Sequence, residues 1–310
     1  MKNGVRQDEH PGTVGALIDW CAGELDAGGV YCGHGTASTI DESASLVYHV
    51  AGLEHDALNH NVRAAHYALP IDAKQFEQVH ELLRRRIDRR IPTPYLLNEA
   101  WFAGLKFYVD ERVLIPRSPF AELIVARFEP WLGHAPVRRI LEIGTGSACI
   151  AIACATAFPD STVVATDVSD AALEVAAINV ARHGFNDRIT LLQADVFDGV
   201  SGYFDLIVSN PPYVPEAEME SLPAEYLHEP SIALASGPDG LASARRILQD
   251  AAGHLESGGM LAVEVGAGWR DLEAALPRLP FVWPALERGG EGIALIRATD
   301  LAGAQSGKVS

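Results

Sequence analysis

The chain has 310 residues, of which 24 are lysine or arginine and 41 are aspartate or glutamate, so its net charge is −17. The length predicts about two domains, and 48% hydrophobic with 21% charged residues is typical of a globular protein. The acidic balance disfavours general nucleic-acid coating, because polyphosphate is repelled. No apolar segment is long enough for a membrane span, and the N-terminus lacks a signal-peptide pattern. We expect a soluble, cytoplasmic protein.

Cysteine usage adds a further constraint. The four cysteines show neither the paired spacing of a metal site nor the density of a disulfide framework. Cys149 and Cys154 fall in an apolar run, where buried free thiols are the simplest interpretation. We therefore expect no metal site.

The first hundred residues carry apolar positions at helical spacing. Three amphipathic helices are predicted, over residues 14–25, 41–53 and 76–87. Asp41 is expected to cap the second of them, and Pro92 ends the third because proline cannot continue a helix. We assign residues 1–98 to a helical N-terminal domain.

After residue 98 the pattern changes to that of strands. Aromatic pairs flank Gly104 within residues 99–115, which predicts a β-hairpin linking two domains. Over residues 116–300, short aliphatic runs alternate with helical stretches, as in an α/β fold whose mostly parallel sheet is covered on both faces. The expected strands are Arg139–Ile143, Thr162–Thr166, Ile189–Gln193, Asp205–Ser209 and Met260–Val265.

Two further aliphatic runs close this domain. Phe281–Leu286 and Gly292–Arg297 are separated only by glycines and charged residues, which predicts an antiparallel hairpin at the edge of the sheet. Residues 301–310 are rich in glycine, serine and alanine. We expect them to form a disordered tail.

A candidate cofactor site follows the first strands of the sheet. Glu142, Gly144, Thr145 and Gly146 lie where the first strand ends, and glycines at such a place let backbone amides approach a ligand. Asp167 follows Gly144 by 23 residues, and its carboxylate can accept hydrogen bonds from both ribose hydroxyls. Asp195 and Val196 follow the third strand. They can meet an adenine amino group beside an apolar wall.

The glycines alone are also compatible with a tight strand–helix turn, so the identity of the ligand rests on their surroundings. A dinucleotide site requires Gly-x-Gly-x-x-Gly with the pyrophosphate at the helix N-terminus. Here the third small residue, Ala148, lies one position before the place of the third glycine in that motif. In addition, Glu142 would repel a pyrophosphate. A cationic ligand is tolerated, so S-adenosylmethionine fits better than NAD.

The fourth strand ends in Asn210-Pro211-Pro212-Tyr213. The prolines have no N–H, so their carbonyls and the Asn210 side-chain oxygen offer hydrogen-bond acceptors to a planar –NH₂ group. The Tyr213 ring offers a flat surface on which that group can lie. Next to an adenosine-type site, this pattern predicts methyl transfer to a planar nitrogen, with alignment and water exclusion as the main catalytic devices.

These motifs resemble those of the HemK-type class I methyltransferases, which methylate the side-chain amide nitrogen of a glutamine in proteins. Within that family the chain is most similar to the PrmB branch, whose substrate is large-subunit (50S) ribosomal protein three. The similarity is carried by residues 31–36, 89–92, 95–96, 101–102 and 110–119. In the last segment Ser118-Pro119 stands where the release-factor branch, PrmC, has Pro-Asp.

The resemblance implies a Rossmann-like, mostly parallel seven-stranded sheet, with the N-terminal helical domain as the substrate-recognition domain and residues 116–300 as the catalytic domain. It implies S-adenosylmethionine as cofactor, with Pro116 and Arg117 bordering its pocket. Its partner would be ribosomal protein three or an assembling large-subunit particle, with no direct nucleic-acid substrate and no membrane. Ala148 replaces the third glycine usual in the family, which we expect to be tolerated if the position has φ below zero.

Three alternatives remain open at this point. The chain could belong to the release-factor branch, or methylate a nucleic-acid adenine, although its acidity and lack of a second basic domain count against the latter. A non-catalytic, cofactor-binding assembly factor is a third possibility, against which the intact Asn210 and Tyr213 argue.

Several charged features have both a structural and a functional interpretation. The five arginines between Arg84 and Arg90 form a solvated helix face in the favoured interpretation and a contact for ribosomal RNA or protein in the other. His34 is more simply a capped turn histidine than a ligand. Residues 214–230 carry five glutamates and no lysine or arginine, which suits either a basic protein substrate or a solvated loop.

Overall fold

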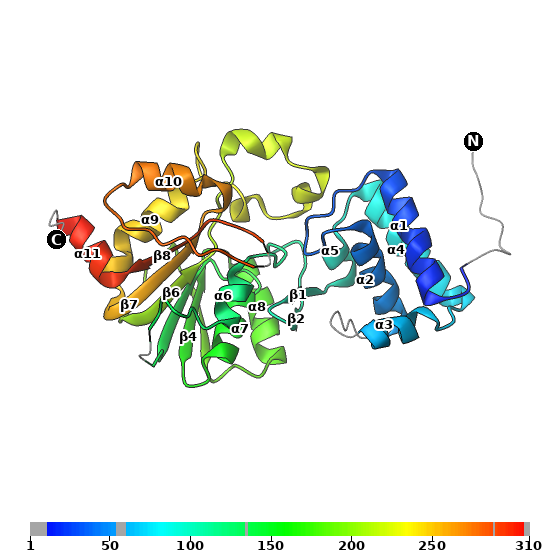
Figure 1. Cartoon of the computed structure of the whole chain (residues 1–310), viewed down its shortest axis with the longest axis horizontal. Helices are drawn as coiled ribbons and strands as arrows, with labels where there is room; N and C mark the ends of the chain where they lie inside the picture. The colour runs from blue at the N-terminus through cyan, green and yellow to red at the C-terminus, as the bar shows by residue number, and fades with distance from the viewer. Residues whose placement is uncertain (1–10, 54–59, 134–135, 288, 307–310) are drawn as a thin grey trace. The chain divides into compact units, whose positions relative to one another are not determined.

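The computed structural model describes residues 11–53, 60–133, 136–287 and 289–306 (Figure 1). The chain divides into two compact units, Met1–Glu99 with Pro223–His228, and Ala100–Leu222 with Glu229–Ser310. The sequence predicted a division close to residue 99, but not that Pro223–His228 groups with the helical unit. Among the described residues, no helix has the length and apolar character that crossing a bilayer requires.

The helical unit is built from α1 (Val14–Gly28), α2 (Thr39–Ala51), α3 (His60–Tyr67), α4 (Ala73–Arg89) and α5 (Thr93–Leu97). Of these helices, α1, α2 and α4 have side-chain N-terminal caps, from Thr13, Ser38 and Asp72. Their apolar faces share one core, in which Leu17, Leu46 and Leu83 are almost fully buried. The expected cap of α2 is wrong: the Ser38 side chain accepts the Asp41 backbone N–H, because the helix begins two residues earlier than predicted.

The second unit begins with the antiparallel hairpin of β1 (Ala100–Phe102) and β2 (Leu105–Phe107). A six-stranded sheet follows, in the order β5-β4-β3-β6-β7-β8, with only the β7–β8 pair antiparallel. Its strands are β3 (Arg139–Ile143), β4 (Thr162–Asp167), β5 (Ile189–Gln193), β6 (Phe204–Ser209), β7 (Leu255–Glu264) and β8 (Ile293–Arg297). The predicted α/β fold is confirmed.

Helices cover both faces of this sheet (Figure 1). They are α6 (Phe120–Val125), α7 (Cys149–Ala157), α8 (Asp170–Arg182), α9 (Ala242–Asp250), α10 (Trp269–Ala275) and α11 (Ala298–Ser306). Neighbouring residues of β3 point to opposite faces, so Ile140 packs in the core with α6, α7 and α8, whereas Leu141 packs with the helices from α9 onward. The chain continues from β3 to β4 on one side and returns to β6 on the other, so a ligand crevice is expected at the carboxyl ends of these strands.

Two expectations at the C-terminal end are wrong. The predicted strand over residues 281–286 is a single bridge between Val282 and Leu295, because Pro280 and Pro284 flank it and proline cannot donate to a ladder. The described sheet therefore has six strands instead of the seven that the resemblance implied. The tail predicted from residue 301 is helical as far as Ser306, because Leu301 is buried in the core; residues 307–310 lie outside the described residues.

Candidate active site

The glycine turn after β3 leaves open space beside its backbone. Gly144 and Gly146 have φ values of 73° and 53°, in the left-handed region that glycine adopts without strain. A Cβ atom added at either position would meet no other atom within 4 Å. The backbone N–H of Thr145 donates to the Thr166 carbonyl at 2.8 Å, which holds the turn against β4. The turn is therefore held in place with room for a ligand beside it.

Glu142 lies beneath this turn and is 1% exposed. One of its carboxylate oxygens accepts both the Thr145 hydroxyl and the backbone N–H of Ala151, at 3.0 Å, in the first turn of α7. Burial raises the pKa of Glu142 to about 8, although these two hydrogen bonds oppose the shift. One oxygen of Glu142 thus links the turn to α7, whereas the other has no hydrogen-bond partner among the described residues.

Ala148 does not meet the condition under which its replacement of a glycine was expected to be tolerated, namely a φ below zero. This residue precedes α7 with a φ of 63°, a left-handed conformation that costs an L-residue about 1–2 kcal/mol. Its methyl group is fully buried in the core. The backbone conformation therefore remains the one that a glycine would adopt, even though the sequence places an alanine there.

Asp167 ends β4 with both carboxylate oxygens facing backbone donors. Oδ2 accepts the N–H of Gly146 at 2.9 Å, and Oδ1 accepts that of Ser169 at 3.0 Å. Burial raises the pKa of Asp167 despite these hydrogen bonds. Each carboxylate oxygen can accept more than one hydrogen bond, so both keep acceptor capacity for a ligand.

At the third strand end, Asp195 has a partner that sequence reasoning missed. Its carboxylate pairs with Arg246 of α9 at 2.9 Å, with both side chains about half exposed. The two residues lie 51 positions apart, so no local pattern signals the pair. The next residue, Val196, has a φ of 58°, which is unusual for a β-branched side chain and is typical of constrained functional loops.

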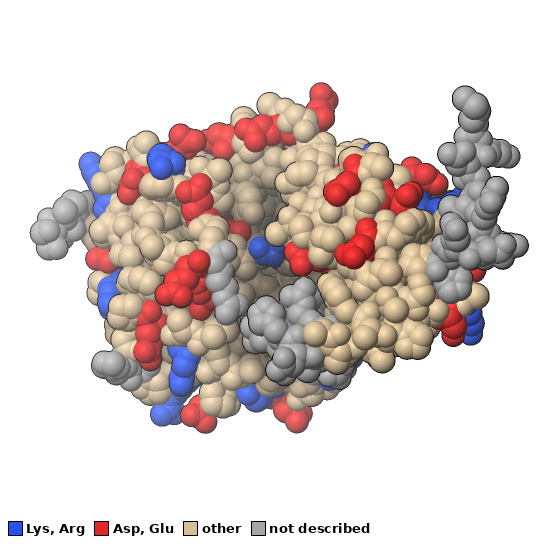
Figure 2. All heavy atoms as spheres, turned by 45° about the vertical axis from the view of Figure 1, so that its right-hand side comes forward, with Lys and Arg blue, Asp and Glu red and all other residues tan. Residues whose placement is uncertain are grey.

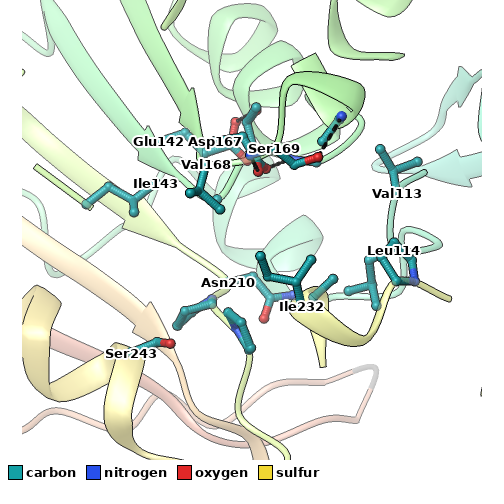
Figure 3. Close-up of a pocket in the computed structure, with 18 of the residues that line it drawn as sticks. Val113, Leu114, Glu142, Ile143, Asp167, Val168, Ser169, Asn210, Ile232 and Ser243 are labelled. Atoms are coloured by element: carbon teal, nitrogen blue, oxygen red, sulfur yellow. Dashed lines mark hydrogen bonds between the residues drawn. The ribbon is translucent and has the colours of Figure 1, made fainter. Parts of the chain in front are cut away.

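The reacting end of the site follows β6. The Ser209 hydroxyl donates to the Ile143 carbonyl at 2.8 Å, which ties the ends of β6 and β3 together. Asn210 then lies across a cavity from Glu142 and Asp167 (Figure 3). Its side-chain amide has no hydrogen-bond partner within the described part of the chain, so its polar atoms are available to a substrate.

The cavity has a volume of about 380 Å³, within the usual range for small-molecule sites. It brings together nearly all the predicted site residues, namely Pro116, Arg117, Glu142, Gly144, Thr145, Gly146, Asp167, Asp195, Val196, Asn210, Pro211 and Pro212. Tyr213 is outside this lining, and its hydroxyl donates to Glu264 at 3.2 Å. Sequence reasoning also missed the apolar wall formed by Val113, Leu114 and Ile232 (Figure 3).

Several charged residues are less exposed than the sequence indicated. Arg86 is 1% exposed and pairs with Glu42 and Glu225, so the arginine-rich helix does not present a uniformly solvated face. Glu229 is also buried, and it pairs with Arg117 at 2.6 Å. Glu225 and Glu229 are therefore not solvated, because each has an arginine partner. The interpretation of residues 214–230 as a solvated loop is wrong at these two positions.

The other residues with two interpretations are also buried. His34 packs against Tyr226, with ring centroids 4.5 Å apart. Cys149 and Cys154 are buried free thiols, as predicted, and burial raises the pKa of Cys149 to about 12. No group of three or more potential metal-ligating side chains occurs in the residues that the structure describes.

The mostly parallel sheet, the glycine turn and the acidic strand ends define a Rossmann-like methyltransferase. In agreement, residues 123–239 match the model of the methyltransferase small domain family. A solved structure of the hMettl16 catalytic domain with an RNA hairpin shares the fold, with a TM-score of 0.50 and 18% identity over 78% of this chain and 85% of that one.

Curated relatives identify the family more closely. A ribosomal protein uL3 glutamine methyltransferase of Francisella tularensis is 40% identical over 93% of this chain and 91% of its own length. A protein of the same name from Neisseria meningitidis serogroup B is 43% identical over 92% of both chains. The chain belongs to the family of ribosomal protein uL3 glutamine methyltransferases, and it is a protein-glutamine methyltransferase.

Proposed function

We propose that this enzyme transfers the methyl group of S-adenosylmethionine to the side-chain amide nitrogen of a glutamine in ribosomal protein uL3. The observation that carries the proposal is the position of Asn210, whose unengaged amide lines the same cavity as the glycine turn and Asp167. Such a substrate would place the enzyme's action in the cytoplasm, on free uL3 or on an assembling large-subunit particle.

The residues of the cavity fit S-adenosylmethionine. The carboxyl groups of Asp167 and Asp195 stand at neighbouring strand ends, where they can accept hydrogen bonds from ribose hydroxyls and from an adenine amino group. Pro116 and Arg117 line the cavity on another side, although the Arg117 guanidinium is paired with Glu229. Glu142, whose pKa burial raises to about 8, holds its proton at neutral pH and adds no negative charge that would repel a ligand there.

The cofactor would supply an electrophilic methyl group, and the chain's own residues would orient the nucleophile. An amide nitrogen is a weak nucleophile because its lone pair is delocalised into the carbonyl. Asn210 and the Pro211 carbonyl would accept hydrogen bonds from the two amide N–H groups, which holds the nitrogen in line with the methyl group and increases its electron density. The nitrogen–methyl bond would form as the sulfur–methyl bond breaks, leaving a neutral thioether. One amide proton would then leave the positively charged nitrogen for solvent, so no dedicated general base is required. Alignment in a site that excludes water is the main source of rate enhancement in this scheme.

The protein substrate is inferred from the relatives' names and from charge. Acidic side chains greatly outnumber basic ones on the face shown in Figure 2, consistent with the net charge of −17. A basic ribosomal protein would be attracted to such a surface, which favours rapid and specific association. The same charge disfavours a nucleic-acid substrate.

Labelling with radioactive S-adenosylmethionine tests the substrate directly. Purified enzyme is expected to methylate uL3 on a glutamine side chain, with mass spectrometry identifying the residue, and to leave a peptide release factor unlabelled. Duplex DNA and large-subunit precursor particles form two further arms. Labelling of the release factor alone would move the enzyme to the sister branch, and labelling of DNA alone would refute a protein substrate.

Two substitutions separate binding from chemistry at the site. Asn210→Ala should reduce single-turnover methylation about a hundredfold, as for loss of one preorganised polar partner, with little change in cofactor affinity. Asp167→Ala should instead weaken cofactor binding by about 1.5–3 kcal/mol, because it removes hydrogen bonds to a charged group. Rapid quench measures the methylation rate of Asn210→Ala, and calorimetry measures the cofactor affinity of Asp167→Ala. Near-normal turnover in Asn210→Ala would contradict the proposed hydrogen bond between Asn210 and the substrate amide.

A further inference from the structure

Glu264 is a buried carboxylate outside the cavity lining, and no role has yet been given to it. It ends β7, is 3% exposed, and forms no ion pair with a lysine or arginine among the described residues. Instead, two hydroxyl groups donate to it. The Tyr213 hydroxyl donates to Oε1 at 3.2 Å, and the Ser118 hydroxyl donates to Oε2.

The Ser118 hydroxyl has partners on two sides. The N–H of Phe120, the first residue of α6, donates to Ser118 Oγ at 3.1 Å. When Glu264 is ionised it can only accept, so the Ser118 hydroxyl donates its single hydrogen to Glu264. The Glu264 carboxylate is therefore held from one side by a serine that is itself fixed at the start of a helix.

On the other side, Glu264 and its neighbours hold the tyrosine. Gly266, two residues beyond Glu264, approaches the Tyr213 ring so closely that an added Cβ would lie 2.9 Å from a ring carbon. Gly292 in turn packs against the Gly266 backbone, since a Cβ atom added to Gly292 would lie 2.0 Å from the Gly266 carbonyl oxygen. The segment after β7 thus provides both a wall for the ring and an acceptor for its hydroxyl.

We propose that Glu264 is a positioning residue: it holds the Tyr213 ring, which lies outside the cavity lining and directly after Asn210-Pro211-Pro212, in the orientation in which the substrate amide would meet it during methyl transfer. This inference rests on the proposed function, because it acts through the tyrosine that directly follows Asn210-Pro211-Pro212. Glu264 does not touch the substrate in this scheme. It acts on turnover through the hydrogen bond to Tyr213, while the cofactor contacts at the ends of β3, β4 and β5 are left unchanged.

The protonation state of Glu264 gives this arrangement a pH dependence. Burial raises the pKa of Glu264 to about 7, against the opposing effects of the Ser118 and Tyr213 hydrogen bonds and the Arg117 charge. The register partner on β8, Ile293, brings no charge. The ionised carboxylate can accept from both hydroxyls, whereas the protonated acid carries a hydrogen on one oxygen. Turnover is therefore expected to rise as the pH increases through 7.

A double-mutant cycle tests the inference, using single-turnover methylation of uL3 at saturating cofactor. Glu264→Leu and Tyr213→Phe each remove the same hydrogen bond, so each should slow turnover about tenfold. The double variant should be no slower than either single variant, because the effect of Glu264 passes through the Tyr213 hydroxyl. Cofactor affinity should be the same in all four proteins, and Glu256→Leu, an exposed position on the same strand, is the matched control.

Glu264→Gln keeps the size of the side chain and removes its titration. Like the protonated acid, glutamine has a single acceptor oxygen, so the turnover of this variant should stay near the low-pH level of wild type and should not rise through pH 7. Glu264→Gln also replaces Glu264→Leu as the test of the inference when the leucine variant does not fold. Additive effects in the cycle, or an unchanged pH profile in Glu264→Gln, would overturn the inference while leaving the proposed function intact. An inactive wild type on uL3 would instead refute the proposed function, and the inference with it.

Discussion

Glu225 in the helical unit and Glu142 in the catalytic unit are both buried, yet their surroundings shift their pKa values in opposite directions. Burial alone would raise the pKa of Glu225, but the Tyr31 backbone N–H and the Arg86 guanidinium outweigh it and lower that pKa. Glu142 has only neutral donors, among them the Thr145 hydroxyl, and burial raises its pKa to about 8. A backbone N–H together with a hydrogen-bonded guanidinium therefore keeps Glu225 charged, whereas neutral donors alone leave Glu142 as a group that titrates.

The charged cluster around Arg86 attaches a distant segment to the helical unit. Arg86 donates to Glu42 and to Glu225, the latter at 2.9 Å, and also to the Tyr31 carbonyl at 2.8 Å. The Thr93 hydroxyl donates to the Glu42 carboxylate as well. These contacts hold residues 223–228, which follow Asn210-Pro211-Pro212 in the chain, within the helical unit.

Removing the cation from this cluster should give the largest stability effect. Arg86→Met leaves buried Glu42 with neutral donors alone and buried Glu225 with Arg90, at 3.7 Å, as its remaining cation, which is expected to cost about 3 kcal/mol in the unfolding of the helical unit. Urea denaturation followed by far-ultraviolet circular dichroism measures it. Arg84→Met, at an exposed position on the same helix, is the matched control and should change stability by no more than about 0.5 kcal/mol. Equal effects of the two substitutions would show that the Arg86 cluster is not a significant stabilising element.

Glu142 should affect stability through pH. Its folded-state pKa, about 8, lies above the ordinary value of 4.5, so between these pH values the folded state holds a proton that the unfolded state has lost. The stability that this proton provides is complete below pH 4.5 and is lost as the pH rises through 8, at about 1.4 kcal/mol per pH unit. Glu142→Gln should remove this component, so its urea stability should fall less than that of wild type between about pH 5.5 and about pH 7.5.

Glu225 provides the opposite control, because its pKa is lowered. The stability that its charge provides is present above the ordinary value of 4.5 and is lost as the pH falls through the lowered pKa. Glu225→Gln should therefore be less stable than wild type at neutral pH, with the difference disappearing in acid. The same pH trend in both glutamine variants would contradict the assignment of opposite pKa shifts.

Much of the fold follows from sequence because its signals are local. The strands Arg139–Ile143, buried in the middle of the sheet, and Ile189–Gln193, at its edge, were both predicted with the bounds they have, since each is a short run rich in aliphatic residues. The arginine cluster is a different case. Arg84 and Arg86 look alike in the sequence, but only Arg86 is buried, because its partner Glu225 comes from a loop 139 residues away. Residues that bear the same local pattern can thus have different roles when a distant segment supplies the partner.

The same distinction holds within the site. The glycine turn, Asp167 and Asn210 were predicted because each follows a recognisable strand end. The Arg246 partner of Asp195 and the Glu264 partner of Tyr213 were not, since each partner lies 51 residues away in another element. Motifs therefore predicted the polar strand ends that line the cavity, whereas its apolar wall and the contacts that hold the site residues in place required the structure.

Ala148→Gly should change the free energy of unfolding least among these substitutions. It tests the backbone conformation of the turn that Glu142 links to α7. At its φ of 63°, Ala148→Gly should regain about 1–2 kcal/mol of backbone strain while losing about 0.8 kcal/mol of methyl burial and about 0.5–1 kcal/mol of unfolded-state entropy. These contributions nearly cancel, so the free energy of unfolding should change by less than about 0.5 kcal/mol. The matched control is Ala151→Gly, equally buried but inside α7, where the same deletion should cost about 1.5–2 kcal/mol. A comparable loss at both positions, measured by urea denaturation, would mean that Ala148 is not left-handed and that the turn does not need a glycine there.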